Sequence, residues 1–189
     1  MTRIAIVIGS TRPGRKAEPV AHWLHQIAST RDDAEFEILD IADFDLPLFD
    51  EPMPPIVGRY TKEHTQRWAE AVDRYDGFVF VTPEYNHSTS GALKNAIDFL
   101  YREWTNKAAG FVSYGTQGGV RAVEHLRLIL AELEVATVRT QVSMSVRADF
   151  ENYTTFKPLD HHEGFANRML DEVVAWSSAL SQLRVTAAA

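Results

Sequence analysis

Short apolar runs alternate along this chain with longer amphipathic segments. The runs are rich in β-branched residues and lack polar alternation, which is typical of strands buried on both faces of a sheet. In the segments between them, apolar residues recur at intervals of three and four, as they do on a helix with one buried face. The predicted strands are residues 4–8, 36–40, 77–82, 109–114 and 136–142, and the predicted helices are residues 17–29, 61–75, 90–104, 121–133 and 161–183.

This alternation of strands and helices predicts an α/β fold. Right-handed helical crossovers between parallel strands give a doubly wound sheet with helices on both faces. Arg139 in the last strand suits an edge position, because one side of an edge strand is solvated. Two segments are expected to be irregular, namely the proline-rich residues 44–57 and residues 146–159. No internal repeat or linker divides the chain, so residues 1–189 are expected to form one domain, with a frayed end through Ala189.

Composition narrows the possible partners. Hydrophobic residues make up 45% of the chain and charged residues 24%, which is ordinary for a globular protein. The net charge of −7 argues against a nucleic acid or an anionic membrane as partner. The chain has no cysteine, which excludes disulfides, thiol chemistry and thiolate metal sites. No apolar run approaches the length of a membrane span and no secretory leader is recognisable, so a cytoplasmic location is expected.

The turn after the first strand, residues 9–16, is the candidate anion site and is called the first turn below. It leads into a helix, so its backbone N–H groups and the helix N-terminus face one concavity. It also carries hydroxyl groups and positive charges, both of which bind phosphate oxygens. These side chains belong to Ser10, Thr11, Arg12, Arg15 and Lys16. Taken alone, they are equally consistent with a solvated loop of an α/β protein.

Known phosphate-binding motifs help to define the ligand. The spacing of Gly9 and Gly14 resembles the P-loop pattern G-x-x-x-x-G-K-[ST], but Arg15 replaces its lysine and Lys16 its hydroxyl residue. Without that hydroxyl the loop has no magnesium ligand, which disfavours triphosphate hydrolysis. The G-x-G-x-x-G fingerprint of dinucleotide-binding proteins is absent. A monophosphate fits the first turn best.

Two further polar turns follow the third and fourth predicted strands. The second turn, residues 83–88, contains the stiff Pro83 and the flat, amphipathic ring of Tyr85. The third turn, residues 113–119, contains three glycines and allows close approach of a planar group. Turns that follow parallel strands lie at the same edge of the sheet, where ligands bind. The three turns together predict a ligand with a phosphate at one end and a flat ring at the other, and flavin mononucleotide (FMN) has this shape.

A purely structural interpretation of these turns stays open. The glycines could serve only the turn geometry, and the aromatic residues could pack in the core. For Tyr114 considered alone, packing in the core is the favoured interpretation.

Three blocks of the sequence occur in the same order in one known family. They are residues 9–12 (GSTR), residues 83–86 (PEYN) with 91–98 (GALKNAID), and residues 113–119 (SYGTQGG) with Arg121. In these blocks, which span about two thirds of the chain, the sequence resembles the NADPH-dependent FMN reductases. This flavodoxin-like family includes quinone, azo-dye and chromate reductases. The resemblance implies a five-stranded parallel sheet of order 2-1-3-4-5.

The resemblance also implies contacts with FMN. Residues of the first turn hold the phosphate, those of the second line the ribityl chain and ring, and those of the third approach the polar edge of the ring. The candidate cofactor-binding residues are Ser10, Thr11, Arg12, Arg15, Lys16, Pro83, Glu84, Tyr85, Asn86, Ser113, Tyr114, Gly115, Gly118 and Gly119. Many relatives carry serine and asparagine near Arg15 and Lys16, so this part of the first turn departs from the family pattern.

The implied activity is hydride transfer from NADPH or NADH to FMN, followed by reduction of a small-molecule electron acceptor. The cofactor carries this chemistry, so no side chain is assigned as an acid or base. The assembly of relatives implies a homodimer or homotetramer with the flavin near the subunit boundary. Two alternatives stay open: a flavodoxin-type electron carrier, which the arginines of the first turn disfavour, and a non-catalytic regulatory domain.

Other residues have structural interpretations. His161 and His162 are adjacent and point in different directions on a helix, so they are interpreted as the start of the last helix and not as a metal site. Glu84 could act as a general base, but a carboxylate in a turn is more often a hydrogen-bond acceptor, and this interpretation is favoured. Tyr101 and Trp104 could be exposed aromatics at an interface, and Trp104 could equally belong to the core. The last helix places apolar residues at intervals of three and four: Phe165, Met169, Val173, Trp176, Leu180 and Leu183.

Overall fold

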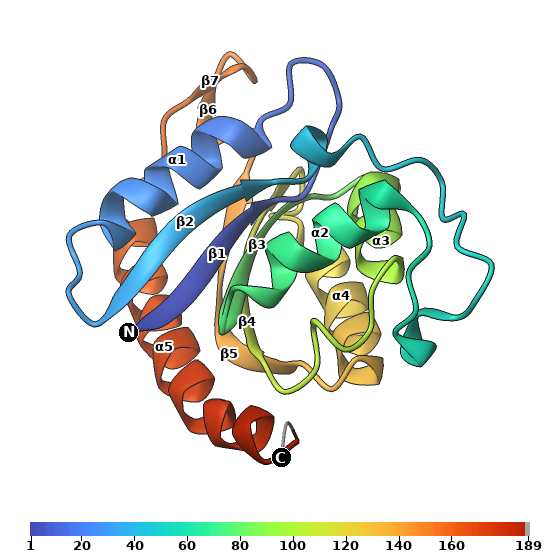
Figure 1. Cartoon of the computed structure of the whole chain (residues 1–189). Coiled ribbons are helices and arrows are strands. Elements are labelled where there is room, and N and C mark those ends of the chain that lie inside the picture. The colour runs from blue at the N-terminus through green and yellow to red at the C-terminus, as the bar shows by residue number, and fades with distance from the viewer. Residues whose placement is uncertain (188–189) are drawn as a thin grey trace.

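A parallel sheet forms the centre of the molecule. In the computed structural model, which describes residues 1–187, five parallel strands lie in the order β2-β1-β3-β4-β5 (Figure 1). The predicted fold class and strand order are therefore confirmed, and residues 188–189 of the end expected to fray lie outside the described part. The strands are β1 (Thr2–Ile8), β2 (Ala34–Asp40), β3 (Gly77–Pro83), β4 (Ala108–Gly115) and β5 (Ala136–Ser145).

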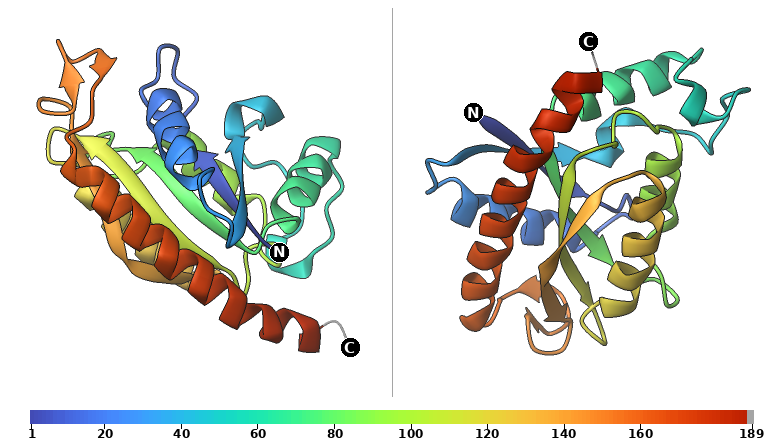
Figure 2. Two further views of the ribbon diagram at one scale, coloured as in Figure 1. Left: turned by 90° about the vertical axis from the view of Figure 1, so that its left-hand side faces the viewer. Right: turned by 90° about the horizontal axis from the view of Figure 1, so that it is seen from below.

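Helices cover both faces of this sheet (Figures 1 and 2). Side chains alternate along a strand, so β1 contributes Ile4 and Ile6 to the core under α1 and α5, and Ala5 and Val7 to the core under α2, α3 and α4. Both layers are apolar, which explains why the strands read as uninterrupted apolar runs. The helices are α1 (Ala17–Ala28), α2 (Glu63–Asp73), α3 (Gly91–Asp98), α4 (Val120–Glu132) and α5 (His161–Ala187).

The predicted helix over residues 90–104 is too long, because α3 ends at Asp98. The carbonyls of Ala96 and Ile97 would accept bonds from a continuing helix. Instead they accept the indole N–H groups of Trp68, at 2.8 Å, and Trp104, at 3.1 Å. Trp104 is fully buried in the core, so its interpretation as an exposed interface residue is wrong.

The inward face of α5 also differs from the sequence pattern. Met169 and Val173 are buried as expected, but Phe165, Trp176 and Leu183 are exposed. The sheet beneath α5 contains glycines at 77 and 110, and a Cβ atom at Gly110 would lie 2.9 Å from Met169 Cγ. This close approach selects the face with small side chains, including Ala166 and Ser177, rather than the face with the largest apolar residues.

The connections contain short elements that the sequence pattern did not predict. The first 3-10 turn, η1 (Ile41–Phe44), follows β2 directly, and the second, η2 (Pro55–Val57), lies within the proline-rich segment. The segment between β5 and α5 forms a two-stranded antiparallel hairpin, β6 (Phe150–Glu151) and β7 (Thr155–Phe156). β5 itself runs three residues past the predicted end, to Ser145, and brings this hairpin to the carboxyl edge of the sheet (Figure 1).

Candidate functional site

The three polar turns meet at a cleft at the carboxyl edge of the sheet. Its cavity has a volume of about 260 Å³. Each turn contributes to the lining, and one residue after β5 completes it. The lining residues are Arg12, Lys16, Pro83, Glu84, Tyr85, Tyr114, Gly115, Thr116 and Val146. The structure thus brings together the segments that the sequence analysis singled out, and it adds Thr116 and Val146.

Two cations of the first turn reach this cleft. The guanidinium carbon of Arg12 lies 6.0 Å from the centre of the Tyr85 ring. Lys16 Nζ lies 5.6 Å from the centre of the Phe150 ring, which belongs to the β6–β7 hairpin. Both cations therefore stand over aromatic faces at the rim and supply positive charge to the cleft.

Arg15 has a different role from Arg12 and Lys16. Its guanidinium forms an ion pair with Asp40 at the end of β2, with Nη1 to Oδ1 at 2.8 Å, and Nη1 also donates to the Ser10 carbonyl at 2.7 Å. Arg15 is absent from the cleft lining. It therefore fixes the first turn to the neighbouring strand, while Thr11 faces a separate cavity.

Two buried hydroxyls at the base of the first turn have no hydrogen-bond partner of good geometry among the described residues. They are Ser10 Oγ and Tyr114 Oη. Burial raises the pKa of Tyr114, whereas the Ser10 hydroxyl, the Arg12 charge and the backbone N–H of Ala17 act to lower it. The phenol therefore lies at the N-terminus of α1, beside Ser10. Buried polar groups in native proteins are normally paired, so these two hydroxyls are available to hydrogen-bond a ligand that enters the cleft.

Glu84 holds the second turn against the third. Its carboxylate forms an ion pair with Arg121 at the start of α4 and accepts the Arg121 backbone N–H at 3.3 Å. The Glu84 side chain is only 5% exposed. Both carboxylate oxygens serve this contact, so Glu84 is a hydrogen-bond acceptor in the second turn.

The second turn contains two successive residues in the left-handed backbone region. Tyr85 and Ser88 exchange backbone hydrogen bonds of 2.9 and 3.2 Å. Between them, Asn86 has φ 47° and His87 has φ 75°. Asparagine tolerates this region better than most residues, which gives Asn86 a conformational role. Asn86 itself is absent from the cleft lining.

The third turn is shaped by Ser113 and the glycines. Ser113 is fully buried, and its hydroxyl donates to the Gly118 carbonyl at 2.7 Å. Gly118 and Gly119 have φ angles of +72° and +73°, a region that favours glycine. Gly115 lines the cleft, whereas Ser113, Gly118 and Gly119 are absent from the lining and position the backbone of the third turn beside it.

Comparison with known proteins identifies the family. The chain matches the NADPH-dependent FMN reductase family over residues 2–149. The chain belongs to this family. It is 42% identical over 159 residues to the NAD(P)H-dependent FMN reductase ntnL of Nectria sp., covering 79% of each chain. It is 36% identical over 139 residues to a quinone reductase of Escherichia coli, covering 70% of this chain and 71% of the relative.

Solved structures of low sequence identity share the fold of this FMN reductase family member. The flavoenzyme NAD(P)H:(acceptor) oxidoreductase FerB of Paracoccus denitrificans superposes with a TM-score of 0.72 at 21% identity, covering 95% of this chain and 98% of that one. An apo form of the NADH:FMN oxidoreductase EMOB gives a TM-score of 0.69 at 21% identity, covering 93% and 89%. These likenesses extend over nearly the whole chain, beyond the residues that the family match covers.

A set of buried contacts beside the cleft was not predicted from the sequence. Asp149 is 1% exposed and accepts from Ser145 N at 2.7 Å, Leu159 N at 3.0 Å and His162 Nε2 at 2.9 Å. Burial lowers the pKa of His162, although Asp149 opposes this effect. These bonds fix the hairpin that carries Phe150 beside the cleft. These bonds leave no signal in the sequence, because Asp149 lies in a segment without helical or strand periodicity.

Neither a metal-binding cluster nor a membrane-spanning helix is found among the described residues. Among residues 1–187, no three His, Asp or Glu side chains are grouped so that they could hold a metal ion. In the same part of the chain, no helix has both the length and the apolar composition needed to span a bilayer. His161 begins α5, as the sequence analysis expected.

Proposed function

We propose that this protein is an FMN-dependent oxidoreductase that oxidises NADH or NADPH and reduces a small acceptor such as a quinone, a free flavin or an azo compound. The observation that carries the proposal is the pair of buried, unpartnered hydroxyls, Ser10 and Tyr114, at the N-terminus of α1. Together with Arg12 and Lys16 they offer a phosphate hydrogen bonds and positive charge in one place. The family membership supports the same function.

The residues of the cleft fit FMN by their chemistry. Ser10, Tyr114 and Arg12 would hold the phosphate, while Pro83 and Tyr85 present rigid and flat surfaces to the ribityl chain and ring. The third turn would approach the ring with backbone atoms at Gly115, where a Cβ atom would lie 3.2 Å from Glu84 Cβ. When bound, FMN supplies the two-electron chemistry of the reaction. The net change is NAD(P)H plus quinone plus one proton giving NAD(P)⁺ plus hydroquinone.

The protein's own contribution is position and electrostatics. Glu84 and Arg121 neutralise each other and fix the second and third turns, so neither is assigned a proton-transfer step. Arg15 and Asp40 do the same for the first turn. The proton taken up with the hydride is therefore assigned to solvent at an open cleft. Such a cleft supports a wide range of small acceptors.

An absorption spectrum followed by a turnover assay tests the proposal. The purified protein should show oxidised-flavin bands, the released chromophore should be FMN, and the protein should oxidise NADH or NADPH in the presence of a quinone. FMN binding without nucleotide oxidation would instead identify an electron carrier. A colourless protein that fails to take up added FMN would identify a regulatory domain.

Removal of one buried hydroxyl gives a sharper prediction. Tyr114→Phe should leave the unfolding free energy of the flavin-free protein unchanged or raise it by up to about 1 kcal/mol, because an unsatisfied group is removed. The same change should raise the FMN dissociation constant about tenfold, through loss of one phosphate hydrogen bond. Denaturant titration and fluorescence quenching of FMN measure the two effects.

Tyr101→Phe is the matched control. The Tyr101 hydroxyl donates to the Glu132 carbonyl at 3.1 Å, far from the three turns. Its loss should lower stability slightly and leave FMN affinity unchanged. If Tyr114→Phe were to lower stability and spare FMN affinity, the phosphate site would lie elsewhere.

We also propose that the whole chain acts as one FMN-binding domain, in the cytoplasm, as a homodimer or homotetramer. The cytoplasmic location agrees with the intracellular pools of NADH and NADPH. The oligomer is supported by exposed apolar side chains on the segment after η1, which include Leu48, Met53 and Ile56. Light scattering of the purified protein tests the assembly, and a monomer at micromolar concentration would refute it. No nucleic-acid or membrane partner is proposed.

A further inference from the structure

A second cavity lies on the other side of the first turn. Its volume is about 410 Å³, within the usual range of small-molecule sites. Thr11 lines this cavity whereas Arg12 lines the flavin cleft, so a single turn separates the two. The remaining lining comes from η1, the residues just after it, and α3. The residues that matter here are Thr11, Ile41, Asp45, Leu46, Ala92 and Ala96.

The position of this cavity follows from the sheet topology. Thr11 follows β1, Ile41 follows β2, and α3 follows the turn after β3. The cavity therefore lies at the carboxyl edge of the sheet, on the β2 side, while the flavin cleft lies toward β4 and β5. Two adjacent cavities on this edge suit two ligands that must meet.

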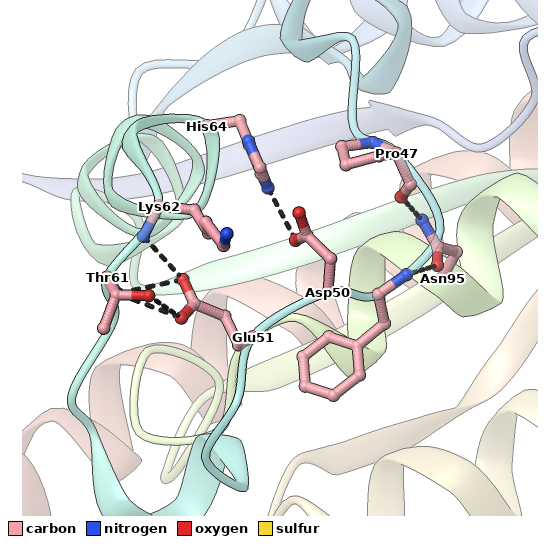
Figure 3. Close-up of polar contacts among 8 residues, drawn as sticks. Pro47, Asp50, Glu51, Thr61, Lys62, His64 and Asn95 are labelled. Atoms are coloured by element: carbon pink, nitrogen blue, oxygen red, sulfur yellow. Dashed lines mark hydrogen bonds and ion pairs between the residues drawn. The ribbon is translucent and has the colours of Figure 1, made fainter.

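The outer wall of the cavity is held rigidly by α3. The Asn95 side chain donates to the Pro47 carbonyl at 2.7 Å and accepts from the Phe49 N–H at 2.9 Å (Figure 3). These two bonds fix the segment that carries Leu46. Farther along, Asp50 contacts His64 Nε2 at 2.9 Å. The wall is preformed, so little ordering entropy opposes the binding of a ligand.

The inner wall is fixed at the end of β2. The Asp40 carboxylate accepts the Ala42 backbone N–H at 2.9 Å, which caps η1, and the same carboxylate pairs with Arg15. The Asp40 carboxylate is therefore fully engaged by these two partners. Asp45 is the carboxylate that lines the cavity. No partner for the Asp45 carboxylate is found among the residues that the structure describes.

No Arg or Lys side chain lines this cavity, so nothing in the lining neutralises a phosphate placed beside Asp45. Arg15 is bound to Asp40, and Arg12 and Lys16 line the flavin cleft instead. Arg67 on α2 donates to the carbonyl of Phe44 at 2.8 Å and is absent from the lining. The cavity therefore offers apolar surface from Ile41, Leu46 and three alanines, and polar groups from Thr11, Asn95 and the unpaired carboxylate of Asp45.

We propose that this cavity binds the adenosine half of the nicotinamide co-substrate, that Asp45 accepts hydrogen bonds from the ribose hydroxyls, and that the protein consequently prefers NADH to NADPH. The inference rests on the proposed function. The apolar side of the cavity, from Ile41, Leu46 and the alanines, accommodates a flat base, and a carboxylate is the usual acceptor for a ribose diol. The additional 2′-phosphate of NADPH would place negative charge against Asp45, and such repulsion is an effective source of specificity.

Binding of nucleotide fragments to the holoenzyme tests this directly. Calorimetry should show that 5′-AMP binds and that adenosine 2′,5′-bisphosphate binds at least about tenfold more weakly. In Asp45→Asn this difference should shrink to about twofold or less, because the repulsion is removed. Asparagine also tolerates the backbone of residue 45, whose φ is 45°, so the variant should fold normally.

Asp43→Asn is the matched control, since Asp43 carries the same charge and is exposed like Asp45 but lies outside the cavity lining. It should leave the preference for 5′-AMP unchanged. In turnover, the ratio of kcat/KM for NADH to that for NADPH should fall at least about fivefold in Asp45→Asn and not in Asp43→Asn.

Several results would overturn the inference. They are no binding of 5′-AMP, an equal preference in Asp45→Asn and the wild type, or a wild-type preference for NADPH. Failure of the proposed function would look different: FMN binding or nucleotide oxidation would be missing, while calorimetry of the two fragments with the protein as purified would still decide the role of Asp45.

Discussion

Gly119→Ala is expected to lower the unfolding free energy by about 3 kcal/mol. About 1 kcal/mol comes from placing an alanine at φ +73°, and about 2 kcal/mol from overpacking. A Cβ atom at this position would lie 2.7 Å from Ser113 Cβ and 2.8 Å from the Tyr114 backbone nitrogen. Both neighbours belong to β4, which cannot move without disturbing the sheet. Denaturant titration of the flavin-free protein measures the loss.

The same variant should also bind FMN at least tenfold more weakly, about 1.4 kcal/mol, because it displaces the third turn that we propose faces the ring. Gly14→Ala is the matched control for stability. Gly14 has a similar φ of +68°, but a Cβ atom added there would meet nothing within 4 Å, so only the backbone cost of about 1 kcal/mol should be measured. Equal losses in the two variants would show that the contact with Ser113 does not matter.

Glu51→Gln is expected to cost about 2 kcal/mol at neutral pH. The Glu51 side chain is buried and accepts the backbone N–H groups of Thr61 and Lys62 and the Thr61 hydroxyl, at 2.8–3.0 Å, at the start of α2 (Figure 3). Burial raises the pKa of this carboxyl, but these hydrogen bonds outweigh burial and lower the pKa to about 2. The figure of about 2 kcal/mol is the full pKa shift reduced for solvent screening.

The sign of the pH dependence follows from that shift. The folded-state pKa lies below the ordinary value of 4.5, so the stabilisation is fully present above pH 4.5 and is lost as the pH falls toward 2. Glu51→Gln should therefore differ from the wild type at pH 7 and converge with it near pH 2. Glu63→Gln removes an exposed carboxylate near the N-terminus of α2 and should cost well under 1 kcal/mol. Parallel stability curves for Glu51→Gln and the wild type between pH 5 and pH 2 would contradict this assignment.

Much of the fold could be predicted from the sequence because its signals are local. The apolar runs of β1 and β3 and the helical spacing in α1 and α4 report burial directly. Parallel strands then force the three turns to one edge, so the cleft was predictable before its geometry was known. The end of α3 was not, because Trp68 and Trp104 stop the helix through hydrogen bonds between distant segments.

The candidate site was also predicted only in part. The cationic first turn was visible in the sequence, but which of its charges face a ligand depends on tertiary neighbours. Arg15 is diverted by Asp40, a residue 25 positions away that carries no pattern of its own. Ser113 likewise proved to hold the third turn rather than face the cleft. The sequence predicts well which residues gather at such a site. Which of their side chains face the cleft depends on neighbours that only the folded structure shows.

The Arg15–Asp40 ion pair couples the first turn to the edge of the sheet. β2 is an edge strand and would ordinarily open early, with rapid exchange of its amide hydrogens. Because its last residue is bonded to the first turn, any ligand that immobilises this turn also restrains β2. Cofactor loading should therefore slow hydrogen exchange along β2, making the outermost strand a reporter of occupancy at a cleft it does not line.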